Sequence, residues 1–190
     1  MPQTPRVTLA AVPLVPEVSI LQASLDAGLW DSSDGEYHSD QPPPFWAFAW
    51  AGGQALARYV LDHPEVVAGL SVLDLGAGSG LVAIAAAKAG ARRVTACDTD
   101  PEAVAAARSN AEANGVRIEG LAEDLLAKGA QADVVLVGDL FYGPTMTNRV
   151  MRFLRRVQTE AGARVLVGDP GRGFLLPDRF TELASYDVPV

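Results

Sequence analysis

The chain has 190 residues, of which 49% are apolar and 20% are charged, and this composition predicts a folded domain with a sizeable core. Its formal net charge of −8 disfavours a nucleic-acid partner, because neutralising phosphates requires a basic face. No apolar run approaches the roughly 20 residues that cross a bilayer, and the first residues lack the order of a signal peptide, so we expect a cytoplasmic protein without a membrane partner.

Residues 1–44 are predicted to form an N-terminal extension. Prolines precede and interrupt residues 7–18, which favours an extended chain over a helix. Residues 19–29 have the composition of a short helix, and the polar, proline-rich residues 31–44 predict a loop.

Residues 45–190 are predicted to form one domain in which strands and helices alternate. In chain order we expect a helix at 53–61, a strand at 71–75, a helix at 80–89, a strand at 93–97, a helix at 101–114, a weaker strand at 116–121, a strand at 132–138, a helix at 145–159, a strand at 163–168, a short helix near 177–183 and a last strand at 185–190. This alternation predicts an α/β fold with a doubly wound parallel sheet. Ligands of such sheets bind at the edge formed by the carboxyl ends of the strands.

A glycine-rich turn follows the first strand of this domain. Gly76, Gly78 and Gly80 are spaced two apart and open the next helix, which favours close approach of a ligand to the backbone. The spacing differs from the GxGxxG fingerprint of dinucleotide-binding proteins and disfavours a dehydrogenase. Asp74, just before the turn, is either a local cap or a partner for the ammonium group of an amino-acid ligand.

Two further acidic positions follow the next two strands. Asp98 ends its strand about twenty residues after the turn, where a carboxylate can accept hydrogen bonds from ribose hydroxyls. Asp100 precedes Pro101 and is expected to cap a helix. Asp124, with Glu123 as the fallback, is placed to accept a hydrogen bond from an adenine amino group or to lie in a solvated turn.

Asp74, Asp98 and Asp124 are placed to contact, in that order, the amino-acid, ribose and adenine parts of one adenosyl ligand. Over roughly residues 45–190 the sequence resembles the class I, seven-strand Rossmann-like methyltransferases that use S-adenosylmethionine. The resemblance implies S-adenosylmethionine as cofactor and S-adenosylhomocysteine as product. It also implies a closing pair of strands, of which the sequence supplies one candidate. We therefore expect an incomplete C-terminal strand pair, either because the chain is truncated there or because the N-terminal extension covers the gap.

The segment Gly138-Asp139-Leu140-Phe141-Tyr142 follows the central strand, where the methyl acceptor arrives in these enzymes. Methyltransferases that act on amides or adenine often carry Asn-Pro-Pro-Tyr or Asp-Pro-Pro-Tyr there. Together with residues 44–59 and 12–17, the segment resembles the electron transfer flavoprotein β subunit lysine methyltransferase family and its bacterial relatives. The resemblance implies a protein-lysine N-methyltransferase whose acceptor is the electron transfer flavoprotein β subunit, with a ribosomal protein as a further candidate.

Five residues are expected to lie where the acceptor meets the cofactor. Asp139 and Tyr142 are predicted to be catalytic, with Asp139 orienting the amine; Phe141 and Trp46 are predicted to contact the acceptor, and Trp50 the cofactor. An aromatic pocket of Phe141, Tyr142 and Trp50 would disfavour the charged form of a lysine, which must be neutral to attack. A helix cap for Asp139 and core packing for the aromatic residues are the alternatives.

Two other functions fit the same residues. A small-molecule amine methyltransferase with a nicotinamide-like acceptor would need a closed pocket, and a non-catalytic adenosyl-binding protein would bind the cofactor without transfer. The lone Cys97 excludes an intrachain disulfide, and His38 and His63 have no ligand spacing, so we expect no metal site. We also expect a monomer.

Overall fold

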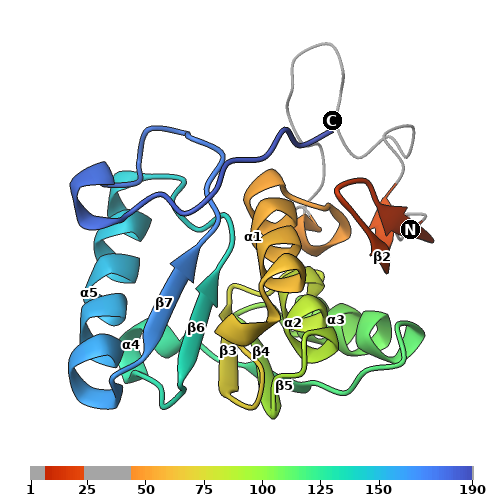
Figure 1. Ribbon diagram of the computed structural model, residues 1–190, viewed down its shortest axis with the longest axis horizontal. Helices are drawn as coiled ribbons and strands as arrows, with labels where there is room; N and C mark the ends of the chain where they lie inside the picture. Colours follow the sequence, from red (N-terminus) through yellow and green to blue (C-terminus); the bar gives the residue numbers. More distant parts are fainter. Residues whose placement is uncertain (1–6, 24–43, 190) are drawn as a thin grey trace, which may run out of the picture.

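A five-stranded parallel sheet is the centre of the computed structural model, which describes residues 7–23 and 44–189 (Figure 1). The strands lie in the order β5-β4-β3-β6-β7. Their bounds are β3 (Ser71–Leu75), β4 (Arg93–Asp98), β5 (Glu119–Ala122), β6 (Val134–Val137) and β7 (Arg164–Val167). The predicted α/β fold with a parallel sheet is therefore confirmed.

Helices cover both faces of the sheet because its inner strands are apolar on both sides. All four residues of β6 are fully buried. Val134 and Leu136 pack with α1 and α2 on one face, and Val135 and Val137 pack with α5 on the other. The helices are α1 (Ala51–Asp62), α2 (Leu81–Lys88), α3 (Pro101–Ala113), α4 (Leu125–Lys128) and α5 (Pro144–Ala161), and the single 3-10 turns are η2 (Phe45–Ala47), η3 (Pro64–Val66) and η4 (Pro177–Arg179).

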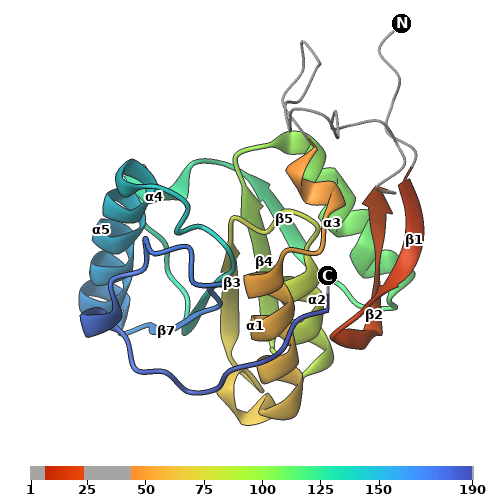
Figure 2. The same ribbon diagram turned by 90° about the horizontal axis from the view of Figure 1, so that it is seen from above.

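An antiparallel hairpin precedes the sheet domain. It consists of β1 (Val7–Val12) and β2 (Val15–Ala23), and Figure 2 shows it against α3, far from α5. The predicted extended chain at 7–18 is confirmed. The predicted helix at 19–29 is wrong where it is described, because residues 19–23 continue β2; the remainder lies outside the described residues.

Two asparagines of α3 attach this hairpin to the domain. Asn110, fully buried, accepts a hydrogen bond from the Leu21 amide and donates one to the Ser79 carbonyl of the glycine-rich turn. Asn114 accepts from the Ser19 amide and donates to the Ser19 carbonyl. The hairpin therefore supports the side of the domain that carries the turn, and it does not cover β7 at the other end of the sheet.

The end of the chain is less regular than predicted. The expected helix near 177–183 is reduced to the single turn η4, and the expected strand at 185–190 does not form over its described residues 185–189. The tail crosses above β7 and α1 instead of running alongside β7 (Figure 1). Among the described residues no strand pairs with the free edge of β7, so the predicted incomplete strand pair lacks both members here.

No helix within residues 7–23 and 44–189 is long and apolar enough to span a membrane. The cytoplasmic location and the monomeric state stay predictions.

Candidate functional site

The predicted site residues gather at one edge of the sheet. In the strand order β5-β4-β3-β6-β7, the chain winds outward from β3 in one direction and from β6 in the other. The boundary between β3 and β6 is therefore the topological switch point, where a crevice forms at the carboxyl ends of the strands. The glycine-rich turn follows β3 and Asp139 follows β6, so both lie at this boundary.

The glycine-rich turn requires its glycines. Gly76, Gly78 and Gly80 all have positive φ, at 70°, 50° and 78°. A Cβ atom on Gly76 would lie 2.6 Å from the Leu140 side chain, and one on Gly80 would lie 2.7 Å from that of Ala107. Larger residues would strain the backbone and collide with these neighbours. The Gly76–Leu140 approach also sets the segment after β6 directly against the turn.

Asp74 lies beneath this turn and is 1% exposed. Its Oδ2 accepts a hydrogen bond of 2.9 Å from the Ala83 amide in the first turn of α2. Burial raises the pKa of the Asp74 carboxyl to about 7, while the Ala83 amide acts in the opposite direction and the charge of Asp98 raises it further. The sequence allowed two roles for Asp74, a local cap or a partner for an ammonium group. The hydrogen bond from Ala83 agrees with the local cap, and contact with a cofactor ammonium group stays a prediction.

Asp98 connects the turn to the end of β4. Its Oδ2 accepts from the Gly78 amide at 2.9 Å, and its Oδ1 accepts from the Asp100 amide at 3.0 Å. Each carboxylate oxygen has a second lone pair, so Asp98 keeps the capacity to accept from two ribose hydroxyls. Asp100 caps α3 by accepting from the Glu102 amide, as its position before Pro101 predicts.

Asp124 is already committed to partners within the protein. Its Oδ1 caps α4 through the Leu126 amide, and its Oδ2 pairs with Arg149 of α5. Glu123, the fallback, pairs with Lys128. Asp124 stands at the carboxyl end of β5, next to the β4 end that carries Asp98. This placement agrees with an adenine site beside a ribose site, and the assignment stays a prediction.

Trp46 lies on the cofactor side of the site. A Cβ atom on Gly78 would be 3.8 Å from the Trp46 Cα, so η2 passes over the glycine-rich turn. The Trp46 indole Nε1 is buried and has no hydrogen-bond partner among the described residues. A buried donor without a partner is costly, and a polar ligand on the turn would remove that cost. The turn, Asp98 and this donor therefore fit a polar ligand such as S-adenosylmethionine, and the predicted contact of Trp46 with the acceptor stays a prediction.

Asp139 is held at the first turn of α1. Its Oδ2 accepts a hydrogen bond of 2.7 Å from the Gly53 amide, 86 residues away in sequence. Its side chain is 13% exposed. Burial raises the pKa of this carboxyl, and the Gly53 amide, the charge of Arg172 and the Gly52 amide oppose that rise. The alternative that Asp139 caps the helix near residue 145 is wrong, because α5 has Gly143 as its N-cap and no side-chain cap.

The aromatic residues near Asp139 divide into exposed and buried groups. Trp50 is 39% exposed; its Nε1 donates to the Phe45 carbonyl, and its ring lies 6.1 Å from the ring of Phe45. Tyr142 is 54% exposed. Phe141 is fully buried and packs edge-on against Phe180. Phe141 therefore has the core position that was its alternative, because its strand-end backbone turns its side chain towards α5.

Arg172, after β7, was missed by sequence reasoning. Its Nη1 lies 3.1 Å from the Asp139 Oδ1, and its Cζ lies 5.9 Å from the centroid of the Trp50 ring. The only signal in the sequence is its place in a Gly-Asp-Pro-Gly-Arg turn after a buried strand. Loops at this edge of the sheet carry ligand-binding residues, and that rule alone could have selected Arg172.

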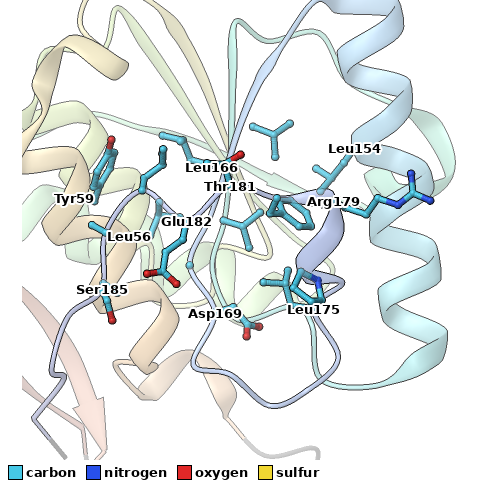
Figure 3. Close-up of a pocket in the computed structure, with 18 of the residues that line it drawn as sticks. Leu56, Tyr59, Leu154, Leu166, Asp169, Leu175, Arg179, Thr181, Glu182 and Ser185 are labelled. Atoms are coloured by element: carbon cyan, nitrogen blue, oxygen red, sulfur yellow. The ribbon is translucent and has the colours of Figure 1, made fainter.

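A cavity of about 1000 Å³ lies beside β7, outside this group of residues (Figure 3). Leu56 and Tyr59 of α1, Leu154 of α5 and Leu166 of β7 line it, and the C-terminal segment closes it. It follows the unpaired edge of β7 and contains neither the glycine-rich turn nor Asp139. We therefore expect the chemistry at the switch point, whereas this cavity lies along the edge of β7 that is unpaired among the described residues.

Comparisons with known proteins agree with this geometry. The family model of ribosomal protein L11 methyltransferase (PrmA) matches residues 54–141. The electron transfer flavoprotein beta subunit lysine methyltransferase of Rattus norvegicus is 40% identical over 166 residues, which cover 84% of this chain and 64% of that protein. Its homolog in Caenorhabditis elegans is 31% identical over 202 residues, which cover 93% of this chain and 82% of that protein. The chain belongs to the electron transfer flavoprotein β subunit lysine methyltransferase family.

The family resemblance predicted from the sequence is thus confirmed. The chain spans a little under two thirds of the length of the rat member of the family. A solved structure, a putative S-adenosylmethionine-dependent methyltransferase from Streptococcus mutans, has a TM-score of 0.53 and 13% identity, and the match covers 80% of this chain and 39% of that one. At this identity the likeness concerns the fold alone.

Proposed function

We propose that this member of the family transfers a methyl group from S-adenosylmethionine to a lysine amine of the electron transfer flavoprotein β subunit. The observation that carries the proposal is the close approach of Leu140 to Gly76, which sets the segment that carries Asp139 against the turn that would hold the cofactor. The names of the rat and C. elegans relatives support the acceptor. We assign the binding and catalytic residues to 45–190 and a supporting role to 1–44.

Chemical groups that lie at the ends of three strands would hold the cofactor. The glycine-rich turn gives close backbone approach, Asp98 accepts from the ribose, and the Trp46 Nε1 supplies a buried donor. Asp124 remains the candidate for the adenine. When bound, S-adenosylmethionine supplies a methyl group that its sulfonium makes electrophilic, and so the protein mainly positions the reactants.

The protein's own residues would prepare the acceptor amine. A lysine is protonated at pH 7 and must lose a proton to solvent before it attacks. The aromatic faces of Trp50 and Tyr142 disfavour full hydration of the ammonium group and tolerate the positive charge that returns to the nitrogen as the new C–N bond forms. The Asp139 carboxylate, fixed by the Gly53 amide, would accept a hydrogen bond from the neutral amine and orient its lone pair.

The exposure of this region favours a protein acceptor over a small molecule. Phe45 and Trp50, which lie just before α1, and Tyr142, three residues after Asp139, are exposed at 53%, 39% and 54%. A lysine on a protein surface can reach such an open face, whereas small ligands are usually held in concave sites that cover most of their surface. The match to the ribosomal protein L11 methyltransferase model makes that ribosomal protein the second candidate acceptor.

The test is transfer of radiolabelled methyl groups from S-adenosylmethionine to the purified flavoprotein β subunit, to ribosomal protein L11 and to proteins of a cell lysate. We expect a labelled β-subunit band that Asp139→Ala removes while calorimetric binding of S-adenosylhomocysteine persists. Asp178→Ala, an exposed carboxylate of η4, is the matched control. Label on L11 alone would make L11 the acceptor in place of the flavoprotein β subunit. Label only in small molecules, or full turnover by Asp139→Ala, would refute the proposal.

A further inference from the structure

The guanidinium group of Arg172 lies between a carboxylate and an aromatic ring. Its Nη1 is 3.1 Å from the Asp139 Oδ1, and its Cζ is 5.9 Å from the centroid of the Trp50 ring, within the range of a cation–π contact. These are the two groups to which the proposed function assigns the acceptor amine. The Oδ2 of Asp139 already accepts from the Gly53 amide, so more of the capacity left for an acceptor lies on the Oδ1 that Arg172 covers.

The two glycines beside Arg172 lie in open space. Gly171 and Gly173 on either side have φ of 80° and 81°, and a Cβ atom on either would meet nothing within 4 Å. Asp169 shapes the turn by accepting from the Gly171 amide. The Arg172 side chain is 32% exposed. Its guanidinium can therefore leave Asp139 without disturbing the packed core.

We propose that Arg172 occupies the subsite of the acceptor amine in the free protein and is displaced by an incoming alkylammonium group. It thereby selects acceptors that arrive as a cation, which loses its proton to solvent before transfer, and that bring enough surrounding protein surface to offset the loss of the Arg172 contacts. An arginine suits this task because it stays charged at every physiological pH. This inference rests on the proposed function, because that function places the amine at Asp139.

The first test measures binding and needs no turnover. The probe is n-butylammonium, which has the same end group and carbon chain as a lysine side chain. It is titrated into the full chain saturated with S-adenosylhomocysteine, and the indole N–H signal of Trp50 is followed by NMR after assignment with Trp50→Phe. In the unaltered protein the probe must break the partly exposed Arg172–Asp139 ion pair, which weakens its binding. Arg172→Ala has no such pair to break and should bind the probe roughly two- to fivefold more tightly.

Three variants sharpen this result. Arg172→Lys keeps a cation and should bind the probe about as weakly as the unaltered protein. Arg172→Ala combined with Asp139→Asn should lose the gain, because the carboxylate charge is gone. Arg179→Ala, on the same C-terminal segment but without a contact to Asp139, should behave as the unaltered protein. Thermal melting of each variant shows whether the fold is kept.

Equal or weaker probe binding by a folded Arg172→Ala variant, including no binding by either protein, would overturn the inference. Methyl-transfer kinetics give a second readout. With the flavoprotein β subunit as acceptor, Arg172→Ala should lower KM and leave kcat unchanged, whereas a loss of kcat would mean that Arg172 positions Asp139 during transfer. If no acceptor is methylated at all, the proposed function fails, and the probe titration still decides whether Arg172 covers a cation subsite.

Discussion

Replacing Asp74 with asparagine tests whether the buried carboxyl beneath the glycine-rich turn titrates near neutral pH. Asp74 is 1% exposed, and burial raises the pKa of its carboxyl from 3.8 to about 7. Asparagine keeps an oxygen that can accept from the Ala83 amide, and it removes the ionisation. We therefore expect Asp74→Asn to change the pH dependence of stability more than the stability at low pH.

The sign follows from proton linkage. Between pH 3.8 and about 7 the folded protein holds a proton on Asp74 that the unfolded chain has lost, so the contribution of this group to the free energy of unfolding falls as the pH rises. Each pH unit corresponds to about 1.4 kcal/mol. Over this window the contribution falls by about 4 kcal/mol, and it is constant above pH 7. Asp74→Asn has no ionisable group at this position, so its free energy of unfolding does not include this decrease.

The assay is urea unfolding of both proteins from pH 4 to pH 8. The free energy of unfolding of Asp74→Asn minus that of the unaltered protein should rise up to about pH 7 and then level off. Taking the difference cancels the titration of the other carboxyl groups. A difference that is flat across the whole range would refute a raised pKa at Asp74. Proton release on S-adenosylmethionine binding at pH 6, lost in the variant, would further support contact between Asp74 and the cofactor ammonium group.

Three further substitutions have expected effects. Gly52→Ala would press a Cβ atom into the Gly168 carbonyl, with Asp139 Oδ2 at 2.8 Å, so we expect a loss of about 1–3 kcal/mol in a melting or urea experiment and of methyl transfer. Asn110→Ala leaves the buried Ser79 carbonyl and the partly buried Leu21 amide without this partner, which should cost about 1–3 kcal/mol and weaken S-adenosylhomocysteine binding measured by calorimetry. Phe141→Ala should cost about 3–5 kcal/mol, and unchanged stability would contradict its core position.

The sheet could be predicted because its signals are local. The strand at 71–75 was predicted at its observed bounds, and β6 follows from an apolar run that only a doubly covered strand would bury. The glycine-rich turn and the cap by Asp100 are also local, since each depends on residues a few positions away. Once the strand order is known, it also follows that the predicted site residues lie together at the carboxyl edge of the sheet.

The rest depends on contacts between distant parts of the chain. Residues 19–23 have no strand pattern of their own; they continue β2 because β1 pairs with them and because Asn110 and Asn114 bond their backbone. Residues 185–189 cross above the sheet instead of pairing with the free edge of β7, and a strand without a partner does not form. Arg172 contacts Asp139 although 33 residues separate them in sequence. The sequence around Arg172 predicts a turn, but it does not predict towards which part of the domain the turn points.

The first turn of α1 fixes the acceptor side of the site through two neighbouring strand ends. The Gly53 amide holds Asp139 after β6, and Gly52 allows the helix to approach the Gly168 carbonyl after β7. A negative charge at a helix N-terminus is favourable, and the Gly53 and Gly52 amides in the first turn of α1 oppose the rise in the pKa of Asp139 that burial causes. Trp50 is the N-cap residue of the same helix. Any shift of α1 therefore moves Trp50 and the anchor of Asp139 together, so the proposed amine subsite would move as one unit.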